Sequence, residues 1–151
     1  MGGAVEYGVV YGLLYYPGKG LGDNRILLQN TSPSGSLENW GCLSEICNYK
    51  SPAEVIREKF DMATGLNLKG WQELGRRRHC PIEEGFMCET VLVYAAILDK
   101  DSIKYIGDSL ERLENSLGFR FETLPNIIHG KNISPDARYI SRHFGVRLRD
   151  N

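Results

Sequence analysis

Three carboxylates repeat along a segment that reads as a helix, residues 52–64. At about 100° per residue, Glu54, Glu58 and Asp61 fall within about 60° of one another, so they share one stripe of the helix. Carboxylate oxygens are the ligands that Mg²⁺ prefers, so this stripe could hold one metal ion. If the protein is an active enzyme, Glu58 and Asp61 would be its catalytic residues, as metal ligands or as the base. The alternative is the ordinary solvated face of an amphipathic helix, and we favour this simpler interpretation.

Basic side chains form a second candidate site, for phosphate rather than for metal. Arg76, Arg77 and Arg78 stand next to one another, and arginine binds phosphate through two parallel hydrogen bonds. Together with Lys50 and Lys59, this cluster could take over the charge that a metal ion would otherwise supply. The residues would then bind an anionic nucleotide without a metal.

Other side chains near these residues have less specific chemistry. The arginine cluster could instead be a solvated loop paired with Glu83 and Glu84, and the sequence leaves both interpretations open. The same two glutamates could supply a general base, although a charged surface loop is the simpler interpretation. Four aromatic residues could stack on a base, but such residues are more often part of a core. They are Tyr15, Tyr16, Trp40 and Tyr94.

Composition excludes several classes of protein. The net charge of -1 gives no global field toward nucleic acid or an anionic membrane, so we expect neither as a partner. The four cysteines (Cys42, Cys47, Cys80 and Cys88) lack the tight pairing of zinc sites, and we expect them to be reduced. No apolar run approaches the roughly 20 residues that cross a bilayer, and no signal peptide is visible. We therefore expect a cytoplasmic protein.

The helix at 52–64 has clear boundary signals. Ser51 can cap its start, proline suits the first helical position, and Glu54 would complete a capping box. Gly65 ends the helix as a left-handed glycine. Ile56 and Phe60 lie on the face opposite the carboxylates and are expected to face the core.

The remaining pattern predicts the fold class. We expect strands over residues 5–16 and 25–30, a short strand near Trp40, and a strand followed by a long loop over 70–86. A buried strand over 89–100, an amphipathic helix over 101–117, a short strand over 119–125 and a helix over 135–144 follow. The order predicts a single α+β domain over residues 1–151, an α/β/α sandwich around a mixed sheet.

The stretch from Trp40 to Leu66 resembles the Nudix box, the loop–helix–loop that binds metal and diphosphate in the Nudix hydrolases (MutT-like proteins). The box reads Gly-x5-Glu-x7-Arg-Glu-U-x-Glu-Glu-x-Gly-U, where U is apolar. Aligned without gaps from its end, Phe60, Gly65 and Leu66 match. The other positions differ: the first glycine is Ser44, the first glutamate Lys50, the arginine Glu58, the next glutamate Lys59, and the final glutamate pair Met62 and Ala63.

This resemblance implies a Nudix-like fold with a degenerate catalytic box. We expect a protein that binds a nucleotide or nucleoside-diphosphate derivative with little or no hydrolysis and no metal cofactor. One alternative is an active, Mg²⁺-dependent pyrophosphohydrolase with a shifted metal site at Glu54, Glu58 and Asp61, which needs one extra residue in the helix. Another is a protein- or RNA-interaction module, with a homodimer formed through the leucine stripe of the 101–117 helix.

Overall fold

The computed structural model describes residues 8–16, 24–31, 39–47, 50–83, 86–98, 100–114, 116 and 118–145. Within these ranges, the backbone alone is described at residues 77–83, 86–90, 100, 102, 105, 106 and 114. The elements are β1 (Val9–Tyr16), β2 (Arg25–Asn30), β3 (Trp40–Gly41), β4 (Leu43–Ile46), α1 (Pro52–Thr64), β5 (Gln72–Glu83), β6 (Phe86–Ile97), α2 (Lys100–Glu114), β7 (Phe119–Thr123), α3 (Leu124–His129) and α4 (Pro135–Phe144).

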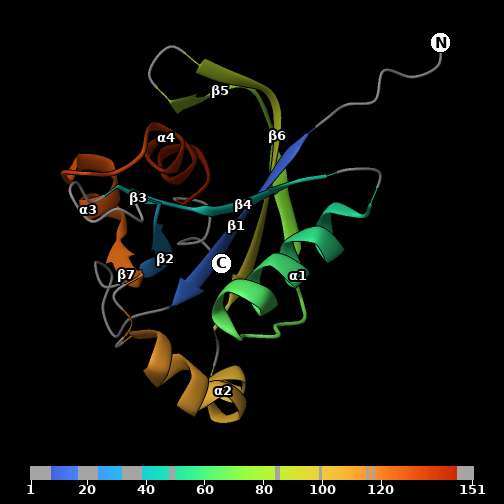
Figure 1. Ribbon diagram of the computed structural model, residues 1–151, viewed down its shortest axis with the longest axis vertical. Coiled ribbons are helices and arrows are strands. Elements are labelled where there is room, and N and C mark those ends of the chain that lie inside the picture. The colour runs from blue at the N-terminus through green and yellow to red at the C-terminus, as the bar shows by residue number, and fades with distance from the viewer. Residues whose placement is uncertain are drawn as a thin grey trace.

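One mixed sheet of seven strands organises the described residues. Its main order is β3-β2-β1-β6-β5, with β4 paired to β1 and β7 paired to β2. Only β1 and β6 run parallel, and they form the centre of the sheet. β1 and β2 pair only at Tyr15 and Tyr16 and then diverge. The segment 40–46 crosses this opening, because its start pairs with β2 and its end pairs with β1 (Figure 1).

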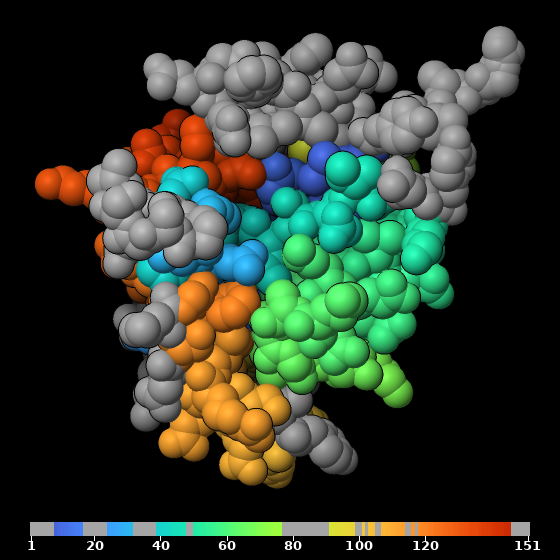
Figure 2. Space-filling view, in the orientation of Figure 1, coloured from blue at the N-terminus to red at the C-terminus, as the bar shows by residue number. Residues whose placement is uncertain are grey.

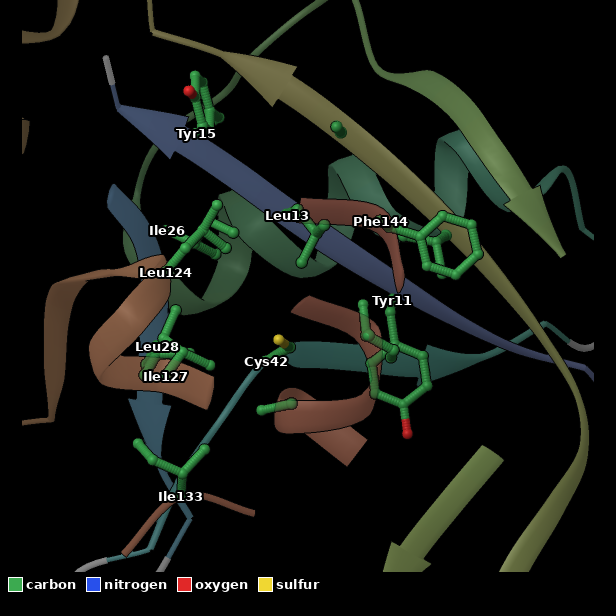
Figure 3. Packing of buried hydrophobic residues seen from close by; sticks show 14 of the residues in the cluster. Tyr11, Leu13, Tyr15, Ile26, Leu28, Cys42, Leu124, Ile127, Ile133 and Phe144 are labelled. Atoms are coloured by element: carbon green, nitrogen blue, oxygen red, sulfur yellow. The ribbon is translucent and has the colours of Figure 1, made fainter. Parts of the chain in front are cut away.

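Helices cover both faces of the sheet, so the predicted α/β/α sandwich is confirmed (Figure 1). Successive side chains of a strand point to opposite faces, and β1 follows this rule. Tyr11 and Leu13 belong to the core beneath α3 and α4, which Figure 3 shows. Val10 and Leu14 belong to the second core, beneath α1 and α2. In the described part of the chain, no helix is both long and apolar enough to span a bilayer.

Helix α1 packs directly on β1 at a glycine. A Cβ atom at Gly12 would lie 2.5 Å from Cε2 of Phe60 and 2.6 Å from Cγ1 of Ile56. Both side chains are fully buried, as their position on the helix predicts, and Phe60 also contacts the ring of Trp71 at 4.7 Å between centroids. Gly12 thus lets the helix approach the strand at van der Waals distance, which fixes where the polar side of α1 points.

The boundaries of α1 confirm one predicted signal and correct another. Gly65 has φ 76° and its N–H donates to the carbonyl of Asp61, so it ends the helix as predicted. The predicted capping box at Ser51 and Glu54 is wrong, because the Ser51 side chain makes no capping hydrogen bond. Proline already removes one of the free N–H groups of the first turn, which lowers the need for a side-chain cap.

Three other parts of the predicted element order need correction. The strand expected after Gly70 extends as β5 from Gln72 to Glu83, where we expected it to give way to a long loop. The strand near Trp40 continues as β4 to Ile46. A short helix, α3, follows β7 without a gap, and its sequence LPNIIH was too short to show a helical repeat.

A hydrogen-bond network ties β1 to the start of α4. The hydroxyl of Tyr11, which is 1% exposed, donates to Oδ2 of Asp136 at 2.8 Å. The Ser134 hydroxyl donates to the other oxygen of the same carboxylate, which also accepts from the N–H of Ala137 at 2.8 Å. Ser134 also caps α4, since its hydroxyl accepts from the Ala137 N–H at 3.4 Å.

Replacing Tyr11 with phenylalanine should lower the free energy of unfolding by about 1.5 kcal/mol, because a partly buried hydrogen bond to a charged group is lost. Urea denaturation measures the change. Tyr139→Phe is the control, because that partly buried tyrosine makes a ring contact with His143 and no described hydrogen bond through its hydroxyl. Equal effects of the two substitutions would contradict the prediction.

Candidate functional site

A pocket of about 480 Å³ opens between α1 and the outer edge of β4, and we call it the α1–β4 pocket. Figure 2 shows the surface of α1 (green) beside that of β4 (teal). Its volume falls in the range of small-molecule sites. The pocket is lined by Glu45, Ile46, Lys50, Val55, Glu58, Lys59, Met62 and Ala63.

The helical repeat explains which side chains of α1 reach this pocket. Residues three and four apart are neighbours on a helix, so Val55, Glu58, Lys59, Met62 and Ala63 form one surface. The adjacent face, with Ile56 and Phe60, is held against the sheet. The four lining positions that correspond to box glutamates therefore share one pocket. They are Lys50, Lys59, Met62 and Ala63.

Charges in the α1–β4 pocket are mixed. Lys59 Nζ lies 3.8 Å from Oε2 of Glu45, and both side chains are partly exposed. The other oxygen of Glu45, Oε1, accepts a hydrogen bond of 3.1 Å from the N–H of Ile46. Lys50 is exposed and makes no ion pair within the described residues. The pocket thus offers two ammonium groups, one of them already beside a carboxylate.

Apolar side chains border the same pocket. Met62 is 88% exposed and Ile46 is 53% exposed. These are two of the three large hydrophobic side chains that are exposed in the described part of the chain. An exposed apolar group at a pocket with charged groups suits a ligand with both a charged and an apolar part.

The predicted carboxylate stripe does not enter the pocket as a unit. Glu54, Glu58 and Asp61 are all exposed, and Glu58 is the one of the three that lines it. Arg57, on the same helix, donates to Oδ1 of Asn67 at 3.3 Å and makes no ion pair with Asp61 within the described residues. The described residues also contain no group of three or more His, Cys, Asp or Glu placed to hold a metal ion.

The arginine cluster lies on β5 rather than in a loop. Arg76 is exposed, lies 3.7 Å from the carboxylate of Glu73 through its Nε, and does not line the α1–β4 pocket. The side chains of Arg77 and Arg78 lie outside the described residues, as do the side chains of Glu83 and Glu84. The arginine cluster and the two lysines are therefore not brought together by the described side chains.

Titratable groups near the sheet have raised pKa values. Burial raises the pKa of the Tyr94 hydroxyl, and the charge of Glu73 adds to this effect. Burial also raises the pKa of the Cys47 thiol, which the nearby Glu45 carboxylate reinforces. The side chains of Cys42 and Cys47 are buried and form no disulfide within the described residues, whereas the side chains of the other two cysteines lie outside them.

Two leucines of the α2 stripe are buried in the core of this chain. Leu110 and Leu113 are each 5% exposed and belong to the core beneath α1 and α2. A second, smaller pocket of about 250 Å³ lies between α2 and the end of α1, and Arg112 lines it. These two leucines are therefore already buried without a second copy of the chain.

Among the lining residues that sequence reasoning missed are the two from β4, Glu45 and Ile46. Neither belongs to a specified position of the box, and a glutamate beside an isoleucine gives no signal of its own. Only the path of β4 past α1 brings them to the pocket. A pattern search confined to the helix has no means of finding them.

Comparison with solved structures identifies the fold. No protein-family model and no curated protein matches the sequence. The chain is similar to Shewanella oneidensis NrtR complexed with a 27mer DNA (TM-score 0.68, 12% identity, 94% of this chain and 62% of that one). It is similar to the NUDIX domain of the same protein complexed with ADP ribose (0.66, 11%, 96% and 90%). It is also similar to the C. elegans Ap4A hydrolase (0.62, 11%, 94% and 98%).

These similarities confirm the Nudix-like fold that the sequence predicted. The chain spans 62% of the length of the NrtR chain, so that protein has a substantial part with no counterpart here. At these identities the likeness shows the fold alone, because one fold can carry many different functions.

Proposed function

We propose that this chain, which has the Nudix fold, binds a nucleoside-diphosphate-type ligand in the α1–β4 pocket with little or no hydrolysis. The observation that carries this proposal is the lining of that pocket. The residues at its box-glutamate positions are two lysines, a methionine and an alanine. Two of the solved structures with this fold are a NUDIX domain complexed with ADP ribose and an Ap4A hydrolase, which makes a diphosphate ligand the natural first probe.

The residues of the pocket do not fit Mg²⁺. This ion requires several hard oxygen ligands in near-octahedral geometry. Met62 and Ala63 supply none, and the ammonium group of Lys59 repels a cation at the place where a carboxylate would attract one. The lining contains two carboxylates, Glu45 and Glu58, and Glu45 already faces the ammonium group of Lys59. We therefore derive no metal-dependent step for this pocket.

The same residues suit a phosphate. Lys50 and Lys59 can donate charge-assisted hydrogen bonds to phosphate oxygens, which are about twice as strong as neutral ones. Met62, which is 88% exposed, presents apolar surface beside them, where a base or sugar ring can pack. The pocket thus provides charge for a diphosphate and apolar contact for the rest of a nucleotide, with no need of a metal.

Lys59→Gln should weaken binding of ADP-ribose about fivefold, because one charge-assisted contact with phosphate is lost. Isothermal titration calorimetry in EDTA measures the dissociation constant. Lys69→Gln is the matched control, since Lys69 is an exposed lysine outside the pocket. Adding Mg²⁺ should leave the affinity unchanged. Equal affinity of the Lys59→Gln and wild-type proteins would contradict the role of Lys59.

A second candidate function, residual pyrophosphohydrolysis, is favoured by one observation. Glu58 lines the pocket, so one carboxylate of the predicted metal site would face a ligand bound there. Turnover of ADP-ribose or a dinucleoside polyphosphate, measured with and without Mg²⁺, decides between the two functions. Mg²⁺-dependent turnover that Glu58→Gln abolishes would overturn the proposal of binding without hydrolysis.

A further inference from the structure

We infer that Glu45 is a built-in competitor for anionic ligands of the α1–β4 pocket, because its carboxylate occupies two donors that a phosphate would use. These donors are the ammonium group of Lys59 and the backbone N–H of Ile46. The inference rests on the proposed function in one respect: it takes an anion as the ligand of this pocket. It assigns to β4 a role in setting affinity that lies outside the helix of the box.

The position of the carboxylate carries the inference. Oε1 of Glu45 accepts a 3.1 Å hydrogen bond from the N–H of Ile46, while Oε2 lies 3.8 Å from Nζ of Lys59. One carboxylate therefore contacts a backbone donor and a cation at the same time. A phosphate has the same charge sign and the same kind of acceptor atoms, so it can replace the carboxylate at both contacts.

The N–H of Ile46 points away from β1, so a ligand can accept from it in place of the Glu45 carboxylate. In an antiparallel pair, successive N–H groups point alternately toward and away from the partner strand. The N–H of Cys47 donates to the carbonyl of Gly8, next to β1, so the preceding N–H points outward. Among the described strands, none pairs with this outer edge of β4. The pocket lies along the same edge.

The contact between Glu45 and Lys59 is weak enough to be displaced. The distance of 3.8 Å exceeds that of a charge-assisted hydrogen bond. The side chains are 31% exposed for Lys59 and 48% exposed for Glu45, so water screens their attraction. An incoming anion can therefore turn the glutamate out into solvent, at the expense of affinity. Removing the Glu45 carboxylate should remove its competition with the incoming anion while leaving the fold intact.

The test measures binding of inorganic pyrophosphate in EDTA by isothermal titration calorimetry at low salt. Glu45→Gln keeps the size of the side chain and removes its charge. We expect pyrophosphate to bind about fivefold more tightly to this variant than to the wild type, since one like charge at contact distance is gone. Glu54→Gln is the matched control, because Glu54 is an exposed carboxylate nearby on α1 that does not line the pocket.

Salt dependence separates this role from a structural one. The gain from Glu45→Gln should shrink at 0.5 M salt (about 4 Å Debye length), because ions screen the removed charge. A structural tie between β4 and α1 would instead lower the melting temperature in both Glu45→Gln and Lys59→Gln and would not tighten binding. Unchanged or weaker pyrophosphate binding in Glu45→Gln overturns the inference.

The two proposals fail in different ways. If the wild type binds neither pyrophosphate nor ADP-ribose but Glu45→Gln binds pyrophosphate, the competitor role is supported and the proposed function fails. If the wild type binds both and Glu45→Gln binds no better, the proposed function is supported and the competitor role fails. If no protein binds either anion, both are overturned, because freeing the donors should have created a site.

Discussion

Replacing Phe60 with alanine is expected to lower the free energy of unfolding by about 4 kcal/mol. Phe60 is fully buried between β1 and Trp71, where it holds the helix of the box against the sheet. Alanine removes most of this contact and leaves a cavity between the helix and the strand beside Gly12. For a chain of this size, the melting temperature should fall by about 8–16 °C.

Chemical denaturation with urea measures the loss, and Met62→Ala is the control on the same helix. Met62 is 88% exposed, so its substitution should change the free energy of unfolding by less than about 0.5 kcal/mol. A loss below about 2 kcal/mol for Phe60→Ala would show that α1 does not depend on this contact.

A double-mutant cycle with Gly12 tests the same contact from the strand side. Gly12→Ala places a methyl group against Phe60 and Ile56 and should destabilise the protein by about 1–3 kcal/mol. In the Phe60→Ala background, the same change should have a smaller effect, because the closest neighbour of the methyl group is gone. Additive effects would indicate that the two residues do not interact.

Restoring the box acids is expected to create a metal site. The triple variant Lys59→Glu, Met62→Glu and Ala63→Glu places three new carboxylates on one surface of α1, beside Glu58. It removes one cation and adds the hard oxygen ligands that divalent ions prefer. We expect Mn²⁺ to bind the variant about tenfold or more tightly than the wild type, because affinity rises with the number of charged ligands.

Titration of Mn²⁺ followed by electron paramagnetic resonance measures the affinity. The charge-matched control, Lys69→Glu with Lys104→Glu, makes an equal change in net charge at exposed positions outside the pocket. Tightening in the control as well would indicate a nonspecific effect of charge. If Mn²⁺ binds the triple variant no more tightly than the wild type, these positions lack metal-binding geometry. The residues at positions 59, 62 and 63 would then not be the reason why the pocket does not fit a metal ion.

Local signals in the sequence predicted the helix of the box closely. Pro52 and Gly65 mark its two ends, and the spacing of Ile56 and Phe60 gives its buried face. These features depend on residues within a few positions of one another, which is why a single sequence reveals them. The prediction of a capping hydrogen bond at Ser51 was wrong, because such a bond depends on side-chain geometry that residue types alone do not specify.

The sequence by itself shows that Lys59, Met62 and Ala63 stand where the resemblance places acids of the box. Only the tertiary structure decided which side chains face the pocket. A helical stripe predicts that Glu54, Glu58 and Asp61 are neighbours, yet its orientation depends on how Gly12 lets the helix rest on β1.

The place of Glu45 depends on tertiary structure in the same way. The sequence puts Glu45 on a different element from Lys59, with a loop between them. The two meet because β1 and β2 diverge, and the segment containing β4 crosses that opening to lie beside α1. Local spacing cannot reveal such a meeting, because it is set by the path of the whole sheet. Residue types determined which charged and apolar side chains the chain can offer, and the packing of α1 on β1 decided which of them lie at the pocket.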